Sequence, residues 1–136
     1  MPSAAPFSIP PLLEGDSLTS DEFMRRWEAI PDLKRAEPID GIVYMPSPVS
    51  LGHGDVQVFL AGWLDVYAIP GCRPNLEGTW LMGVRDVPQP DPTLRILPEY
   101  GGQSRVEGSY ASGAPELIVE VAMSSRARDF GAKKRL

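Results

Sequence analysis

The chain has 136 residues, a net charge of −5 and one cysteine, Cys72. An apolar fraction of 43% and a charged fraction of 23% are those of a water-soluble globular protein of one domain. No apolar run approaches the roughly 20 residues that cross a bilayer, and one cysteine excludes an internal disulfide or a cysteine-rich zinc site. We therefore expect a cytoplasmic protein with no membrane partner.

The first elements are a leader and a short helix. We expect residues 1–18 to form a flexible proline-rich leader, without the basic start of a secretory signal, and residues 19–136 to form one domain. Ser20 is a candidate N-cap for a helix that Pro31 ends. Its predicted apolar stripe consists of Phe23, Trp27 and Ile30.

A hairpin and a long helix follow. Asp40-Gly41 between two extended segments is a strong hairpin signal. Residues 50–68 have apolar positions at spacings of three and four, which is typical of an amphipathic helix. We expect its core face to consist of Val56, Phe59, Leu60, Trp63, Leu64 and Tyr67.

The second half predicts strands separated by turns. Strands are expected over 72–82, interrupted at Glu77-Gly78, and over 91–97, where Pro92 favours a strand start or an edge. Residues 100–113 are rich in glycine and serine and predict a long surface loop. A central strand is then expected over 116–122.

Ser124 and Ser125 predict the cap of a last helix that begins near Arg126 and runs to Leu136. The fold class is therefore α/β (α+β): a mixed, twisted sheet of four or more strands flanked by the helix at 50–68 and the helix from Arg126. Because that last helix has no C-cap, we expect the domain to be incomplete at its C-terminus.

Glu120 is an acidic residue inside the apolar run Leu117–Val121. An ionised carboxylate buried among aliphatic side chains costs several kcal/mol unless a cation or a donor meets it. The candidates are a divalent metal shared with Asp91 and a lysine of the last helix, Lys133 or Lys134.

Several short motifs occur in a fixed order along the chain. They are Glu37-Pro38-Ile39-Asp40-Gly41, Met45-Pro46-Ser47-Pro48, His53, Pro90-Asp91, Glu120-Val121, and Arg128-Asp129 followed by Lys133. This ordered set resembles the Uma-type restriction endonuclease family, a bacterial family of the PD-(D/E)XK nuclease superfamily. The resemblance runs from about Glu22 to the last residue and lacks the family's final strand. It implies a restriction endonuclease-like fold and Mg²⁺-dependent (or Mn²⁺-dependent) hydrolysis of phosphodiester bonds in DNA.

Carried over residue by residue, the resemblance implies that Asp91 and Glu120 are catalytic metal ligands, together with the backbone carbonyl of Val121. Lys133 would be the catalytic lysine that orients the attacking water or stabilises charge on the phosphate. The superfamily usually places this lysine two residues after the glutamate, where this chain has Ala122. Lys134 could replace Lys133 in this role.

Two further residues are candidate site residues. Glu37 matches an early acidic position of the family and could reach the metal through water. His53 is the only histidine, and a lone histidine near a helix start is more often a capping or packing residue than a site residue.

Other interpretations stay open for the proposed site. Asp91 could simply start a strand or a turn, Glu120 could face solvent or pair with Arg126 or Arg128, and the two lysines could form a solvated helix face. The alternative function is a catalytically degenerate nuclease fold that binds nucleic acid or a protein partner. A third is an unrelated interaction protein. We also expect the strand at 116–122 to expose an edge that favours a homodimer.

Overall fold

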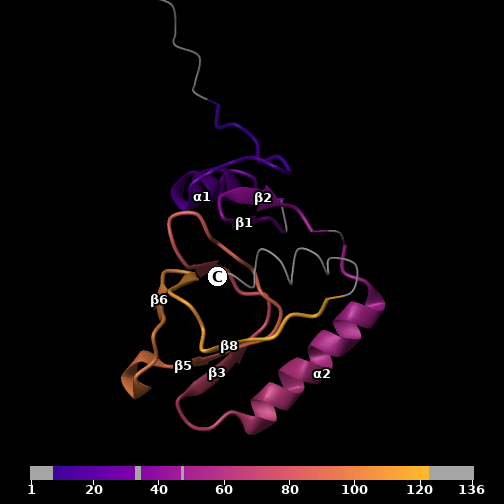
Figure 1. Ribbon diagram of the computed structural model, residues 1–136, viewed down its shortest axis with the longest axis vertical. Helices are drawn as coiled ribbons and strands as arrows, with labels where there is room; N and C mark the ends of the chain where they lie inside the picture. The colour runs from indigo at the N-terminus through magenta and orange to yellow at the C-terminus, as the bar shows by residue number, and fades with distance from the viewer. Residues whose placement is uncertain (1–7, 33–34, 47, 123–136) are drawn as a thin grey trace, which may run out of the picture.

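The computed structural model describes residues 8–32, 35–46 and 48–122. Within them the chain forms two α-helices, a 3₁₀ turn and eight short strands (Figure 1). In chain order these elements are α1 (Ser20–Glu28), β1 (Glu37–Ile39), β2 (Ile42–Tyr44), α2 (Leu51–Tyr67), β3 (Cys72–Asn75), β4 (Trp80–Leu81), β5 (Thr93–Ile96), η1 (Pro98–Tyr100), β6 (Arg105–Glu107), β7 (Tyr110–Ser112) and β8 (Leu117–Ile118).

The strands form three small sheets. β1 and β2 make an antiparallel hairpin, β3-β5-β8 is an antiparallel sheet, and β4-β7-β6 contains one parallel pair, β4 with β7. The α+β class with mixed strand pairing is therefore confirmed. The described strands are divided among sheets of two, three and three strands, however, where the sequence led us to expect one sheet of four or more.

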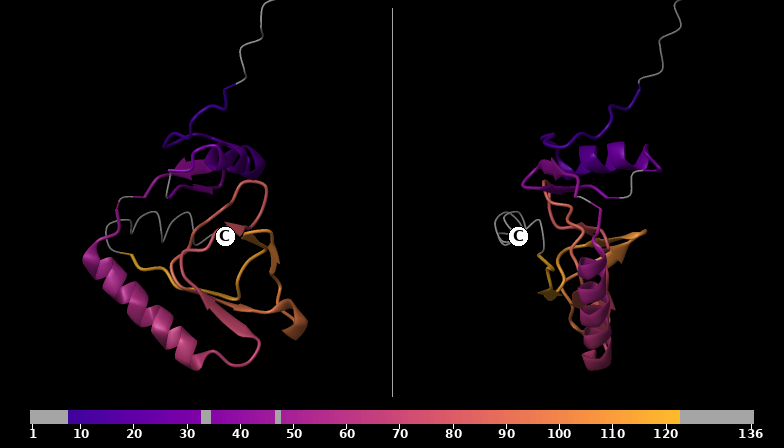
Figure 2. Two further views of the ribbon diagram at one scale, coloured as in Figure 1. Left: turned by 180° about the vertical axis from the view of Figure 1, so that it is seen from behind. Right: turned by 90° about the vertical axis from the view of Figure 1, so that its right-hand side faces the viewer.

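The N-terminal elements form a layer across one end of the molecule, from which α2 extends (Figure 2). A hydrophobic cluster holds this layer together, and its buried members are Leu12, Phe23, Ala36, Val43 and Val87. The segment before α1 joins the hairpin through backbone hydrogen bonds from Gly15 to Val43 at 2.8 Å and from Leu18 to Gly41 at 2.7 Å. The leader expected over residues 1–18 thus contains a packed segment from Leu12 onward.

The N-cap of α1 is Thr19, one residue before the predicted cap Ser20. The Thr19 hydroxyl accepts the backbone N–H of Glu22 at 3.2 Å, which satisfies one of the free donors of the first turn. Ser20 instead donates its hydroxyl to the backbone carbonyl of Gly83, a longer-range bond that its sequence neighbours do not reveal. As predicted, Phe23 on the inner face of this helix is buried.

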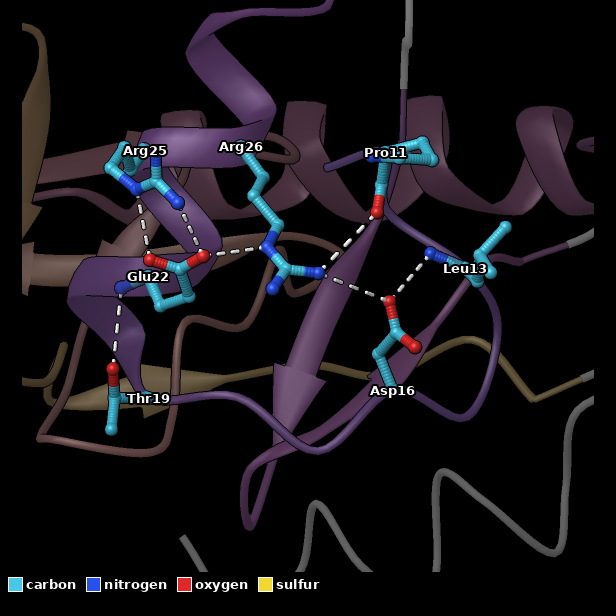
Figure 3. A network of polar contacts seen from close by, with 7 residues as sticks. All are labelled: Pro11, Leu13, Asp16, Thr19, Glu22, Arg25 and Arg26. Atoms are coloured by element: carbon cyan, nitrogen blue, oxygen red, sulfur yellow. Dashed lines mark hydrogen bonds and ion pairs between the residues drawn. The ribbon is translucent and has the colours of Figure 1, made fainter. Parts of the chain in front are cut away.

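An ion-pair network fixes α1 on the preceding segment (Figure 3). Glu22 accepts hydrogen bonds from Arg25 and Arg26, and these bonds lower the pKa of Glu22 to about 2. Arg26 also reaches Asp16 at 3.7 Å and the Pro11 carbonyl at 3.5 Å. Arg26 therefore ties the helix to the packed segment before it.

The predicted hairpin at Asp40-Gly41 is confirmed. Asp40 has a φ of 50° and Gly41 a φ of 78°, so both turn residues have the left-handed conformation that a tight two-residue hairpin turn requires. A Cβ at Gly41 would also lie 2.5 Å from the guanidinium of Arg85. Asp40 is thus a turn residue.

The long helix is confirmed as α2, capped by the Ser50 hydroxyl, but its predicted core face is only partly right. Leu64 is buried and Leu60 half-buried, whereas the aromatic residues are exposed. Phe59 is 70% exposed, Tyr67 67% and Trp63 50%. The face that turns inward is instead made of His53, Gln57, Leu60 and Leu64, of which Gln57 and Leu64 are buried. These four residues also follow a helical spacing, but a search for apolar periodicity passes over a stripe that is half polar.

Two other predicted elements need correction. The expected loop at 100–113 contains the hairpin β6-β7, which turns at Gly108 with a φ of 63°. The expected central strand over 116–122 is only two residues long, and this strand, β8, lies at the edge of its sheet among the described strands. The predicted helix from Arg126 lies outside the described residues. No helix in the described part of the chain is long and apolar enough to cross a membrane.

Candidate functional site

The candidate site is built around Asp91, whose residue is 4% exposed. Asp91 lies in the buried segment 87–93, where Pro88, Pro90 and Pro92 alternate with polar residues. A proline has no backbone N–H to satisfy, so this spacing reduces the number of donors that burial would leave unpaired. The segment can therefore carry Asp91 into the interior in an extended conformation.

Three donors meet the Asp91 carboxylate. Gln57 Nε2 donates to Oδ1 at 2.8 Å, and His53 Nε2 lies 3.2 Å from the same oxygen. The backbone N–H of Val121 donates to Oδ2 at 2.7 Å. Because an unpaired buried carboxylate is costly, these three bonds explain how Asp91 can be buried.

α2 supplies two of the three donors. His53 and Gln57 are four residues apart, so their side chains lie on the same face of the helix, one turn apart. The Ser50 hydroxyl accepts the backbone N–H of His53 at 3.1 Å and fixes the first turn. His53 is thus not only a packing residue of the helix start, because its ring reaches Asp91.

A second acidic residue, Glu77, lies against the same glutamine. Gln57 Nε2 is 3.3 Å from Glu77 Oε1, and Arg35 Nη1 donates to that oxygen at 3.1 Å. Glu77 has a φ of 58°, a left-handed conformation that costs a residue other than glycine about 1 kcal/mol or more. Arg35 also donates to the backbone carbonyl of Gln89 at 3.3 Å.

Glu37 is buried beside the segment that carries Asp91. Its residue is 2% exposed, and its Oε2 accepts the backbone N–H of Gln89 at 2.7 Å. This bond anchors the strand β1 to the proline-rich segment two residues before Asp91. Glu37 therefore lies near Asp91 along the chain path, although the described contacts do not join the two carboxylates directly.

Asp91 and Glu120 lie beyond the same end of the β5-β8 strand pair. In that pair Thr93 lies opposite Ile118, and the Val119 N–H donates to the Pro92 carbonyl at 2.8 Å. Asp91 precedes Thr93 and Glu120 follows Ile118, each by two residues, so both acidic residues lie just outside the paired strands.

The other predicted site residues have different outcomes. Val121 contacts Asp91 through its backbone N–H, whereas its carbonyl was the predicted ligand. Lys133 and Lys134 lie outside the described residues. Among the described residues, no cluster of three or more histidine, cysteine or acidic side chains has the arrangement of a metal site.

Three residues around Asp91 are not among those that the sequence predicts for the site: Gln57, Glu77 and Arg35. Gln57 had one usable signal: it is a polar residue four positions after the only histidine of the chain, on the same face of the predicted helix. Glu77 and Arg35 had none, because they are 42 residues apart and only the fold brings them together.

These features define an α+β protein with a buried acidic site beside an antiparallel strand pair. The chain belongs to the Uma2 family, described as putative restriction endonuclease, whose family model matches residues 20–136. This match agrees with the resemblance drawn from the ordered motifs. No curated protein has a matching sequence.

Proposed function

We propose that the protein is a metal-dependent endonuclease that hydrolyses phosphodiester bonds in DNA, with Mg²⁺ or Mn²⁺ as its cofactor. The observation that carries the proposal is the buried Asp91 carboxylate, which lies beyond the same end of the β5-β8 strand pair as Glu120, in a chain of a restriction endonuclease family. Fold and family alone do not define a reaction. The proposal therefore depends on the chemistry that these two carboxylates can perform.

The acceptor capacity of Asp91 fits a hard cation. A carboxylate offers about four lone-pair sites, and the three donors described above leave one of them, on Oδ2. Mg²⁺ and Mn²⁺ prefer oxygen ligands such as carboxylates, backbone carbonyls and water. Asp91, Glu120 and the Val121 carbonyl together would supply such a set.

Each residue has a distinct proposed task. Asp91 and Glu120 hold the ion, and Lys133, or Lys134 in its place, orients the attacking water and stabilises charge on the phosphate. A divalent ion supplies a Lewis acid for the scissile phosphate and lowers the pKa of water. Glu37 would position a water molecule at the site.

Cleavage of supercoiled plasmid DNA tests the proposal, with Glu120→Gln compared against Glu107→Gln as the matched control. Glu107 is exposed on β6, so its substitution should leave cleavage unchanged. We expect Mg²⁺-dependent nicking by the wild type that Glu120→Gln lowers at least about 100-fold, as expected when a metal-ligating charge is lost. Glu120→Ala should also stay folded. Equal cleavage by wild type and Glu120→Gln would reject the assignment.

A second candidate function is a catalytically degenerate member that binds nucleic acid or a protein partner on the same fold. The observation in its favour is that three protein donors already satisfy most of the Asp91 acceptor sites. Retained DNA binding without cleavage, measured by fluorescence anisotropy in Mg²⁺, would favour this function over the first.

A further inference from the structure

The buried amide of Gln57 joins two carboxylates. Its residue is 5% exposed, and its Nε2 lies 2.8 Å from Asp91 Oδ1 and 3.3 Å from Glu77 Oε1. The two hydrogens of the amide are therefore both used. The reversed amide orientation would bring the Gln57 carbonyl oxygen against two acidic oxygens, so these carboxylates select one orientation.

Glu77 accepts from this amide and is itself paired with Arg35. Arg35 donates to Glu77 Oε1 at 3.1 Å, so a positive charge lies beside the second carboxylate. The turn that carries Glu77 is itself constrained, because the Asn75 side chain accepts the Gly78 N–H at 3.0 Å and a Cβ at Gly78 would lie 2.3 Å from that oxygen. A left-handed residue maintained in this way is often a functional residue.

Both oxygens of the Asp91 carboxylate consequently accept hydrogen bonds, and their donors come from two different parts of the fold. Gln57 and His53 approach Oδ1 from α2, and the Val121 N–H approaches Oδ2 from the segment that follows β8. Within residues 8–32, 35–46 and 48–122, two donors meet Oδ1 and fill its acceptor sites, whereas one donor meets Oδ2 and leaves one of its sites. The direction of the remaining acceptor site is set by the donors on the other oxygen.

We infer that Gln57 is a positioning residue for Asp91: with Glu77 and Arg35 behind it, it turns the carboxylate so that Oδ2 is the oxygen presented to a divalent cation. The inference rests on the proposed function for the identity of the ligand. The grip on Asp91 itself does not, since it is a property of the protein without metal. Partners that orient a metal ligand typically change metal affinity 10-fold to 100-fold.

The test compares Gln57→Met with the wild type. Methionine has a similar length and no donor, so it removes both hydrogen bonds and leaves the site filled. Gln103→Met is the matched control, because Gln103 is exposed and its side chain makes one long bond of 3.4 Å to the Pro115 carbonyl.

Two quantities are measured on each full-length protein. The first is the Mn²⁺ dissociation constant from calorimetry, with the metal alone as probe. The second is hydrogen exchange of the Val121 amide by NMR, referenced to the Leu97 amide, which donates to the Gly71 carbonyl at 2.7 Å in the same region. We expect Gln57→Met to weaken Mn²⁺ binding at least about tenfold and to raise Val121 exchange by a similar factor, with Leu97 unchanged. Gln103→Met should change neither.

The outcomes separate the inference from the proposed function. If the wild type binds no Mn²⁺, the proposed function fails, and Val121 exchange alone decides whether Gln57 orients Asp91. Faster Val121 exchange with unchanged Mn²⁺ affinity would reduce Gln57 to a structural residue and overturn the inference, as would unchanged exchange. If Gln57→Met does not fold, Glu77→Asn takes its place, because asparagine tolerates the left-handed conformation but is too short to hold Gln57. The same two changes, of smaller size, are then expected.

Discussion

The two faces of α2 differ in a way that reverses the usual amphipathic helix. The inward face presents His53 and Gln57 to Asp91, and Leu64 is buried on the same face about two turns after Gln57. The outward face carries large apolar side chains, among them Phe59 and Trp63. The hydrogen bonds to a buried carboxylate therefore set the orientation of this helix. Apolar burial alone would have placed the face with Phe59 and Trp63 inward.

The two free-energy costs involved differ enough to explain this orientation of α2. Leaving Asp91 buried without its donors would cost several kcal/mol, whereas exposed apolar side chains cost far less one by one because protein surfaces are normally about half apolar. The polar face thus determines how α2 lies.

The largest effect is expected from Asp91→Ala. This change removes one of the two acceptors of the buried Gln57 amide and the acceptor of the Val121 N–H, so the free energy of unfolding should fall by about 3–5 kcal/mol. Urea denaturation measures it, with Asp65→Ala on the exposed side of α2 as control. A loss no greater than that of the control would show that α2 does not depend on Asp91.

Shortening one side chain on each face of α2 to alanine should show directly which face is packed. Leu64 is 3% exposed and Val66 is 80% exposed. Leu64→Ala should lower the free energy of unfolding by about 2–4 kcal/mol through the cavity it leaves, whereas Val66→Ala should stay within about 0.5 kcal/mol. Chemical denaturation of both variants is the measurement, and equal losses would contradict the assigned orientation.

Replacing an outward aromatic residue should have a smaller effect still. Phe59→Ser exchanges an exposed ring for a small polar group, and the expected change in the free energy of unfolding is under about 1 kcal/mol, because the ring is mostly exposed and the two residues have similar helix propensities. Thermal unfolding of this variant beside the wild type provides the test. A loss comparable to that of Leu64→Ala would mean that Phe59 is covered in solution.

Glu116 offers the smallest effect and a carboxylate independent of α2. Desolvation raises its pKa, but the backbone N–H groups of Gln103 and Ile96 outweigh this and hold the pKa below its ordinary value. A lowered pKa in the folded state stabilises the fold above the pKa of the unfolded chain, about 4.3, and this contribution is lost as the pH falls through the lower value.

The acid limb of stability therefore tests Glu116. The melting temperature of the wild type should lose this contribution below about pH 4, and Glu116→Gln should be less stable at neutral pH and flatten that limb. A pH dependence unchanged by Glu116→Gln would show that its two backbone bonds contribute nothing.

Local signals in the sequence predicted the parts of the fold that are local. Asp40-Gly41 specified its hairpin because both residues adopt the left-handed conformation easily, and α2 lies within the helix predicted over 50–68. The glycines around the hairpin β6-β7 predict a loop, because glycine is typical both of long loops and of tight turns; here Gly108 makes the turn that joins the two strands.

The sequence predicts only part of the site, also because local signals do not show long-range contacts. The motifs singled out Asp91, Glu120 and His53, but the donors that explain the burial of Asp91 come from α2 and from beyond β8, at 34 and 30 residues' separation for Gln57 and Val121. Such long-range hydrogen bonds follow from the packing of the elements, and residues next to them in the sequence do not predict them. The inward turn of α2 depends on the same long-range bonds.

The central claim is that Asp91 is a metal ligand held in place by α2. Calorimetric titration with Mn²⁺ tests it most directly, on the wild type and on Asp91→Asn, which keeps the size of the side chain and removes its charge. We predict that the wild type binds one ion and that Asp91→Asn binds it at least about 100-fold more weakly. Undiminished Mn²⁺ binding by Asp91→Asn would contradict the claim.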